Sequence, residues 1–208
     1  MQKSQRPLSM LRSYTPADAL TIGNATCGTI CLFLCVDYMA FGDTRRLWIA
    51  IWLLPLALVF DALDGYVARL STRRQSVLGA DLDSLADVIS FGVAPAVLGY
   101  TLGLRGGWDM VCLVYFVVCG VSRLARLNVT ASMLTDEHTG KVAYFEGTPI
   151  PTSIAIVGLL AMALWAGHVQ EDIWFGVWRI GPASLHPLVL VYVASGSAMI
   201  STIRIPKP

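Results

Sequence analysis

The sequence predicts an all-α integral membrane protein with about six transmembrane helices, and two observations carry that prediction. Of its 208 residues, 55% are hydrophobic and only 14% are charged, whereas about a quarter of the residues in a soluble globule are charged. The apolar residues also gather in runs of about 20, the length that a helix needs to cross a bilayer. The formal net charge of +1 gives no basic excess, so nucleic acid is not an expected partner.

The apolar runs place the spans at about 17–40, 47–69, 82–102, 110–128, 151–168 and 185–203. We find no internal repeat and no signal peptide, and we treat residues 1–208 as a single transmembrane catalytic domain. The polar residues 1–16 are expected to lie along the membrane surface. In the third span, Gly92 and Pro95 permit close packing or a kink.

The basic residues orient these spans. An even number of spans puts both termini on one side of the membrane. Of the 15 Lys and Arg residues, four fall on the opposite side (Arg45, Arg46, Arg105 and Arg179), which leaves 15 − 4 = 11 on the side of the termini. Because cytosolic loops carry the excess of Lys and Arg, the termini are predicted to be cytosolic.

Four aspartates lie where the second span ends and the third begins. Asp61 and Asp64 are three residues apart, and Asp83 and Asp87 are four apart, so each pair lies on one helical face. If a turn around residues 72–76 folds one helix back on the other, four carboxylates converge and need a cation. Oxygen ligands favour Mg²⁺, Mn²⁺ or Ca²⁺. The alternative is a set of helix caps that meet water.

The residues between the aspartate pairs suit a nucleotide diphosphate. Gly65 and Ala68 allow a ligand to approach the backbone closely, and Gly79 precedes the second pair. Arg69 offers a permanent cation whose fork matches phosphate.

The two segments together resemble the signature of the CDP-alcohol phosphatidyltransferase family. They read Asp61-x2-Asp64-Gly65-x2-Ala68-Arg69 and Gly79-x3-Asp83-x3-Asp87. The segment between Arg69 and Gly79 is one residue longer than that family's usual spacing, which leaves the places of Arg73 and Arg74 open.

The resemblance implies two divalent metal ions, Mg²⁺ or Mn²⁺ with Ca²⁺ as an alternative, held by Asp61, Asp64, Asp83 and Asp87. It further implies that CDP-diacylglycerol is the donor. The residues implied to hold its CDP part are Asp61, Gly65, Ala68, Arg69 and Gly79.

The same resemblance implies that Asp87 is the general base and that CMP is released. It puts the active site at the cytosolic ends of helices 2 and 3. The enzyme is expected to be a homodimer in a bacterial or archaeal plasma membrane or in the endoplasmic reticulum.

The acceptor depends on the end of the fourth span, where Arg123, Arg126 and Asn128 follow one another. Two guanidiniums and an amide suit a small zwitterion, whereas snorkelling to lipid phosphates is an equal alternative. Two parts of the sequence resemble the phosphatidylserine synthase branch of this family: the residues around these three, and the block Phe91-Gly92-Val93-Ala94-Pro95. That resemblance implies L-serine as the acceptor.

Several alternatives remain open. A sister enzyme would use glycerol 3-phosphate or inositol phosphate, and a cation channel or transporter would also carry acids within the membrane. Asn24 would either touch a ligand or bond another helix. The stripe formed by Cys27, Cys31 and Cys35 would hold a metal or, as we favour, pack as reduced thiols. The polar stretch 130–147 is either a lid or an ordinary loop.

Overall fold

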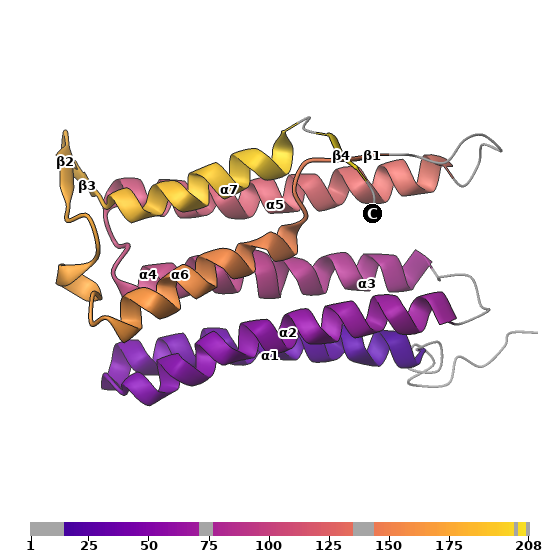
Figure 1. The fold of residues 1–208 in the computed structure, drawn as a ribbon, viewed down its shortest axis with the longest axis horizontal. Helices are drawn as coiled ribbons and strands as arrows, with labels where there is room; N and C mark the ends of the chain where they lie inside the picture. The colour runs from indigo at the N-terminus through magenta and orange to yellow at the C-terminus, as the bar shows by residue number, and fades with distance from the viewer. Residues whose placement is uncertain (1–14, 71–76, 135–143, 202–203, 207–208) are drawn as a thin grey trace, which may run out of the picture.

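The computed structural model describes residues 15–70, 77–134, 144–201 and 204–206. For residues 69–70, 77–78, 130–134, 144–146 and 204–206 it describes the backbone only. The helices run along one long axis; one small antiparallel ribbon lies beside them and a second stands at one end of the bundle (Figure 1). The turn at 72–76, with Arg73 and Arg74, and residues 135–143 of the stretch 130–147 lie outside the described residues.

The helices are α1 (Pro16–Phe41), α2 (Thr44–Leu70), α3 (Val77–Asp87), α4 (Ala94–Leu102), α5 (Gly107–Leu134), α6 (Ile154–Trp165) and α7 (Leu190–Ile200). A π-helical segment, η2 (Val88–Val93), joins α3 to α4 without a break. Single-turn 3-10 segments are η3 (Ile150–Ser153), η4 (Gln170–Asp172) and η5 (Pro187–Val189).

The four strands are short. β1 (Tyr144–Glu146) pairs with β4 (Arg204–Pro206), with Phe145 opposite Ile205. β2 (Trp178–Ile180) and β3 (Ala183–Leu185) form a hairpin, with Arg179 opposite Ser184.

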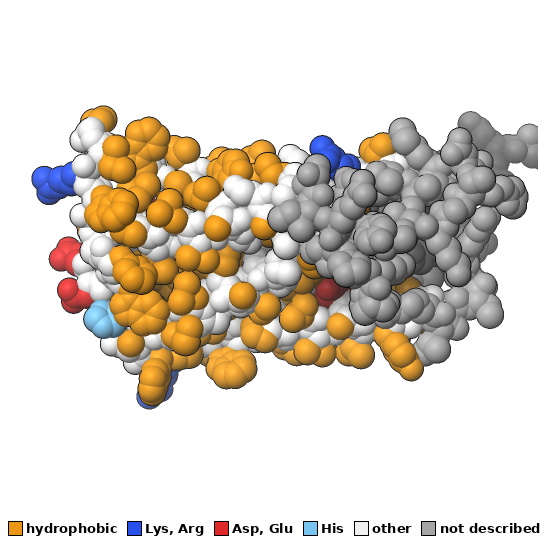
Figure 2. Space-filling model, turned by 45° about the horizontal axis from the view of Figure 1, so that its top comes forward, with side chains coloured by type: hydrophobic (Ala, Val, Ile, Leu, Met, Phe, Trp, Pro, Cys, Tyr) orange, Lys and Arg blue, Asp and Glu red, His pale blue; other side chains and the backbone are white. Residues whose placement is uncertain are grey.

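Four helical segments are long and apolar enough to cross a membrane: Pro16–Phe41, Thr44–Ala68, Gly79–Leu102 and Gly107–Val129. Two shorter apolar segments, Ile150–Trp165 and Pro187–Ile200, accompany them. Apolar side chains cover the middle of the face seen in Figure 2, whereas charged ones gather at the end that carries the hairpin. The chain is therefore a multi-pass integral membrane protein, as predicted.

Helix ends extend beyond the apolar runs because polar residues cap them. Thr15, rather than Asp18, is the N-cap of α1, and the two exchange backbone–side-chain hydrogen bonds of 2.6 and 3.3 Å. α2 begins at Thr44, so Arg45 and Arg46 lie in its first turn and not in a loop. Arg46 forms an ion pair with Asp37, which joins α2 to the end of α1.

The π-helical segment lies where the third span passes α1. Pro95 has no N–H to donate to the preceding turn, and the N–H of Ala94 bonds the carbonyl of Ile89, five residues back. Gly28 of α1 packs on this wider turn so closely that a Cβ would lie 2.9 Å from the Cα of Ser90. The expected irregularity around Gly92 and Pro95 is thus a π-helix that brings α1 close to the third span.

The core lies along the axis of the bundle. Phe116 of α5 and Tyr192 of α7 are almost fully buried and meet edge to face at 5.3 Å. The Tyr192 hydroxyl donates to the carbonyl of Pro95 at 2.7 Å, so α7 is tied to α4. Cys27, Cys31 and Cys35 are buried free thiols, which confirms that this stripe packs.

Candidate active site

The predicted aspartates lie in the last three turns of α2 and within α3. The end of α2 and the start of α3 are at the same end of the bundle (Figure 1). Carboxylate oxygens of Asp61, Asp83 and Asp87 lie within 4.8 Å of one another. Among the described residues, these three side chains form the one group of His, Cys, Asp or Glu that could hold a metal ion. Three of the four predicted ligands are therefore brought together by residues on two different helices.

Asp64, the fourth predicted ligand, lies outside that group but close to it. Its Oδ2 accepts a hydrogen bond of 2.7 Å from the hydroxyl of Thr21 on α1, and only 6% of the residue is exposed. Asp64 still acts electrostatically on Asp61 and Asp83. The four carboxylates therefore share one repulsive environment, although their side chains are held differently.

The residues fit a divalent cation. Asp87 is only 8% exposed, and Oδ1 of Asp83 is buried without a hydrogen-bond partner. An unpartnered buried carboxylate oxygen is costly. Within the described part of the chain, no Lys or Arg forms an ion pair with these aspartates. A hard cation with oxygen ligands would satisfy both the charge and the orphaned oxygen.

Helix α1 lines the site with two polar side chains three residues apart. Thr21 bonds Asp64, and Nδ2 of Asn24 donates to Oδ1 of Asp87 at 3.2 Å. Asn24 is fully buried, and its own Oδ1 has no partner. Of the two roles open to Asn24, the structure shows the interhelical bond. The role of Thr21 was missed, although a polar pair on one face of an apolar helix is a signal that could have revealed it.

The residues predicted to hold the CDP part lie on the same two helices. Gly65 and Ala68 are partly exposed on α2, and Gly79 lies in the first turns of α3. A Cβ added at Gly65 would meet nothing within 4 Å, so the space beside its backbone is open. The backbone of Arg69 belongs to α2, but its side chain lies outside the described atoms.

The residues predicted to hold the acceptor come from the end of α5, and they differ in their surroundings. Arg123 is half-buried, lies within electrostatic range of Asp87, and has a buried Nε without a partner. Arg126 is exposed.

The Asn128 amide is bonded to α3. Its Oδ1 accepts from the hydroxyl of Ser84 at 3.1 Å, and its Nδ2 lies 3.4 Å from a carboxylate oxygen of Asp81. The structure thus places Arg123 within electrostatic range of Asp87, and it gives Asn128 partners on α3 that the sequence did not predict.

An apolar groove of about 420 Å³ runs between α1 and the third span and reaches the site. Thr21, which bonds Asp64, and Ala86, which precedes Asp87, are among its lining residues. The rest of the lining is almost wholly apolar, including Phe33 and Leu85. A polar site that opens into an apolar groove suits a ligand with a charged head and a hydrocarbon tail.

Comparison with known proteins agrees with this arrangement. Residues 14–194 match the CDP-alcohol phosphatidyltransferase family. The CDP-diacylglycerol–serine O-phosphatidyltransferase of Saccharomyces cerevisiae is 41% identical over 203 residues, which cover 96% of this chain and 73% of the yeast protein. The Helicobacter pylori (strain 26695) protein of the same name is 33% identical over 182 residues, which cover 85% and 68% of the two chains.

An archaeal relative differs in its named product. The archaetidylserine synthase of Methanothermobacter thermautotrophicus is 37% identical over 143 residues, which cover 67% of this chain and 54% of the archaeal protein. The family match spans both aspartate pairs, α1 and the end of α5. The carboxylate cluster on α2 and α3 and this long match lead to one conclusion: the chain belongs to the CDP-alcohol phosphatidyltransferase family.

Proposed function

We propose that this protein is a phosphatidylserine synthase, which transfers the phosphatidyl group of CDP-diacylglycerol to the hydroxyl of L-serine and releases CMP. The observation that carries the proposal is the convergence of Asp61, Asp83 and Asp87 around an orphaned buried oxygen. The acceptor is supported by relatives named as serine phosphatidyltransferases that cover most of the chain.

Two divalent ions, Mg²⁺ or Mn²⁺, are proposed to bind four aspartates: Asp61, Asp64, Asp83 and Asp87. When bound, such ions neutralise the diphosphate and stabilise the charge that develops at the transferring phosphorus. Three of these aspartates already form a group, and Asp64 lies beside it. Thr21 holds Asp64 in place through its hydrogen bond.

The open backbone at Gly65 supports donor binding on this end of α2, where Ala68 and Arg69 follow. Gly79 would contact the same donor from α3. The acyl tails fit the groove between α1 and the third span, because that groove is apolar and extends to Thr21, whose hydroxyl bonds Asp64. The diphosphate would then lie beside the aspartates while the tails stay within the membrane.

Arg123 is the best-supported acceptor residue, since its guanidinium is partly buried within electrostatic range of Asp87 and has an unpartnered Nε. A serine carboxylate would satisfy that donor. Arg126 lies one turn further on, and Asn128 would have to exchange its bonds to Ser84 and Asp81 to reach a ligand.

Asp87 is proposed as the general base. Its Oδ1 accepts a bond from Asn24, which orients the carboxylate and leaves Oδ2 for the proton of the serine hydroxyl. The serine oxygen forms a bond to the phosphorus that carries diacylglycerol, the bond from that phosphorus to the CMP oxygen breaks, and CMP leaves with the electron pair.

The finer topology belongs to the same proposal. The segments Ile150–Trp165 and Pro187–Ile200 complete six spans, so both termini and the carboxylates face the cytosol. The active enzyme is proposed to be a homodimer.

The proposal is tested by measuring CMP release from purified protein in detergent with CDP-diacylglycerol and Mn²⁺. Serine, inositol phosphate and glycerol 3-phosphate are each supplied alone, with Asp87→Asn as the inactive comparison. Release that depends on serine and is lost in the variant is the expected result. Release only with a phosphorylated acceptor would replace the serine assignment, and none with any acceptor would leave a transporter as the better interpretation.

A further inference from the structure

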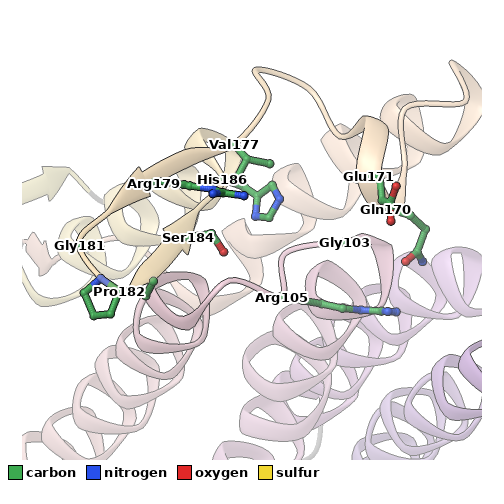
Figure 3. A pocket seen from close by; sticks show the side chains of 11 residues that line it. Gly103, Arg105, Gln170, Glu171, Val177, Arg179, Gly181, Pro182, Ser184 and His186 are labelled. Carbon is green, nitrogen blue, oxygen red and sulfur yellow. The ribbon is translucent and has the colours of Figure 1, made fainter.

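A second cavity lies at the end of the bundle opposite the carboxylates, under the β2–β3 hairpin (Figure 3). We call it the hairpin cavity. Its volume is about 640 Å³, within the range of roughly 300–1,000 Å³ that is usual for ligand pockets. Its walls are the loop after α4, the η4 turn, the hairpin and His186. The proposed transfer reaction uses none of these residues.

Two guanidiniums line the hairpin cavity. Arg105, in the loop after α4, is held against the end of that helix, because its Nε donates to the carbonyl of Tyr100 at 3.1 Å and its Nη2 to that of Thr101 at 3.2 Å. This leaves Nη1 without a partner among the described residues. Arg179, on the exposed strand β2, has no hydrogen-bond or ion-pair partner in the described part of the chain. Guanidiniums with unused donors are suited to a phosphate group.

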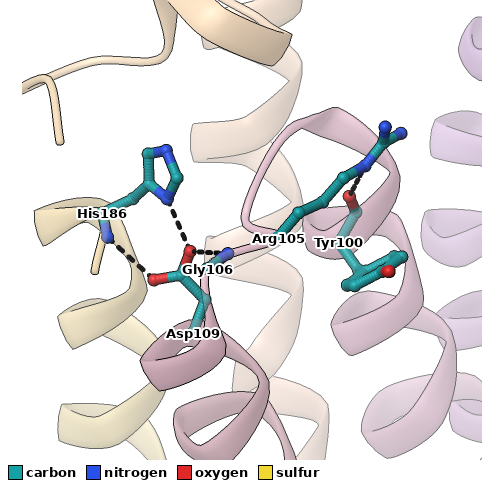
Figure 4. Close-up of polar contacts among 5 residues, drawn as sticks. All are labelled: Tyr100, Arg105, Gly106, Asp109 and His186. Carbon is teal, nitrogen blue, oxygen red and sulfur yellow. Dashed lines mark hydrogen bonds and ion pairs between the residues drawn. The ribbon is translucent and has the colours of Figure 1, made fainter. Parts of the chain in front are cut away.

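A buried pair holds His186 in the wall. Asp109 is fully buried and accepts bonds from the backbone N–H of Gly106 at 2.7 Å and that of His186 at 2.8 Å (Figure 4). Its Oδ2 lies 2.5 Å from Nδ1 of His186. Because the carboxylate engages Nδ1, Nε2 is the ring nitrogen left to the cavity.

The hairpin cavity also contains a negative group. Glu171 lines it from η4, and no ion pair joins Glu171 to Arg105 or Arg179. Its neighbour Gln170 adopts a left-handed backbone with φ of 59° and donates to the carbonyl of Thr101 at 2.9 Å. A strained residue held by a hydrogen bond indicates that this wall is fixed. Two cations and one anion on fixed walls match a ligand that carries both charges.

The cavity also lies at the depth of lipid headgroups. Exposed aromatic side chains surround this end of the bundle, namely Trp108, Trp165, Phe175 and Trp178. Trp108 donates its indole N–H to the carbonyl of Ile180 at 3.0 Å, which fastens the hairpin to α5. Aromatic side chains gather where a membrane protein meets the headgroups.

We propose that the hairpin cavity binds the headgroup of a zwitterionic phospholipid in the leaflet opposite the carboxylates. The phosphodiester contacts Arg105 and Arg179, and the ammonium group contacts Glu171. Soluble phosphoethanolamine also offers a phosphate and an ammonium group, so the test separates the two sources. This site is independent of the transfer reaction and would persist if the acceptor assignment failed.

The test is native mass spectrometry of the delipidated full-length protein in detergent, titrated with phosphatidylethanolamine, phosphatidylglycerol or soluble phosphoethanolamine. Wild type is expected to bind one phosphatidylethanolamine in preference to phosphatidylglycerol. Arg179→Gln should weaken that binding by about tenfold, the usual effect of losing one charge-assisted hydrogen bond. Arg45→Gln is the matched control, since Arg45 is exposed near the same end of the bundle and does not line the cavity.

Glu171→Gln should remove the preference for phosphatidylethanolamine while binding of phosphatidylglycerol persists. The Arg179 side chain forms no hydrogen bond or ion pair within the described residues, so its replacement is not expected to disturb folding. Equal loss of binding in Arg179→Gln and Arg45→Gln would overturn the site. Equal binding of the two lipids by wild type would overturn the zwitterionic assignment, and binding of phosphoethanolamine as tight as that of the lipid would overturn the lipid source.

Discussion

A single oxygen atom distinguishes this site from a set of helix caps. Oδ1 of Asp83 is buried without a partner, whereas a capping carboxylate would accept backbone N–H groups. We predict that Mn²⁺ stabilises the wild-type protein against heat, by about 2.7 kcal/mol at a metal concentration of 100 Kd. Asp83→Asn should lose most of this metal-dependent stabilisation.

The measurement is the melting temperature in detergent with and without Mn²⁺. Asp172→Asn serves as the control, because Asp172 lies in η4 at the opposite end of the bundle. If Asp83→Asn and Asp172→Asn gained as much stability from the metal as wild type, the aspartates would not be its ligands.

Asn24 is predicted to position the base. Its amide donates to Asp87 from a fully buried position, so Asn24→Ala would let the carboxylate rotate. We expect kcat for CMP release to fall by about tenfold, the effect of one lost charge-assisted hydrogen bond, with little change in the KM for serine. Thr152→Ala is the control, since that hydroxyl is exposed, lies outside the groove and bonds the carbonyl of Pro149 three residues back. An unchanged kcat in Asn24→Ala would remove Asn24 from the catalytic arrangement.

At the scale of elements, the junction between α1 and η2 sets how closely the carboxylates can approach α1. A Cβ at Gly28 would lie 2.9 Å from the Cα of Ser90, which is backbone and cannot move aside cheaply. We predict that Gly28→Ala destabilises the protein by about 1–3 kcal/mol through overpacking. Gly23→Ala on the same helix is the control, because its Cβ would meet Phe60 at an ordinary 3.5 Å.

Unfolding followed by circular dichroism in mixed micelles measures the difference. A Gly28→Ala protein as stable as Gly23→Ala would mean that α1 can move away from the third span without loss. The activity of the folded fraction is a second readout, since the same movement would separate Asn24 from Asp87.

The elements differed in how well the sequence predicted them. Apolar runs placed the long helices, because hydropathy determines what a bilayer accepts. Helix ends were less predictable: Thr15 and Asp18 cap α1 through a local exchange of bonds that hydropathy does not register. The π-helix was foreseen only as irregularity around Gly92 and Pro95, since its hydrogen-bond pattern depends on packing against α1.

The site was predictable to the extent that it follows helical spacing. The pairs Asp61–Asp64 and Asp83–Asp87 were found because residues three or four apart share a face. The bond from Thr21 to Asp64 was not found, because it joins residues 43 positions apart and depends on how α1 packs. For the same reason the partners of Asn128 on α3 became visible only in three dimensions.

At the scale of the whole molecule, the proposed function requires that the carboxylate end faces the cytosol, where serine is supplied and CMP is released. The turn between α1 and α2 lies at the other end of the bundle from the start of α3 (Figure 1). We predict that Asp43→Cys reacts with a membrane-impermeant maleimide on intact cells, whereas Ala80→Cys reacts only after permeabilisation. Both positions are exposed, so access depends on the side of the membrane.

Wild type is the control for that labelling, because four of its five cysteines are buried and Cys112 is partly buried within a span. The opposite pattern, with Ala80→Cys labelled on intact cells, would place the aspartates outside and contradict the proposed cytosolic reaction. It would at the same time move the hairpin cavity to the cytosolic leaflet. Lipid binding to Arg105 and Arg179 would then have to be explained by the lipids of that leaflet.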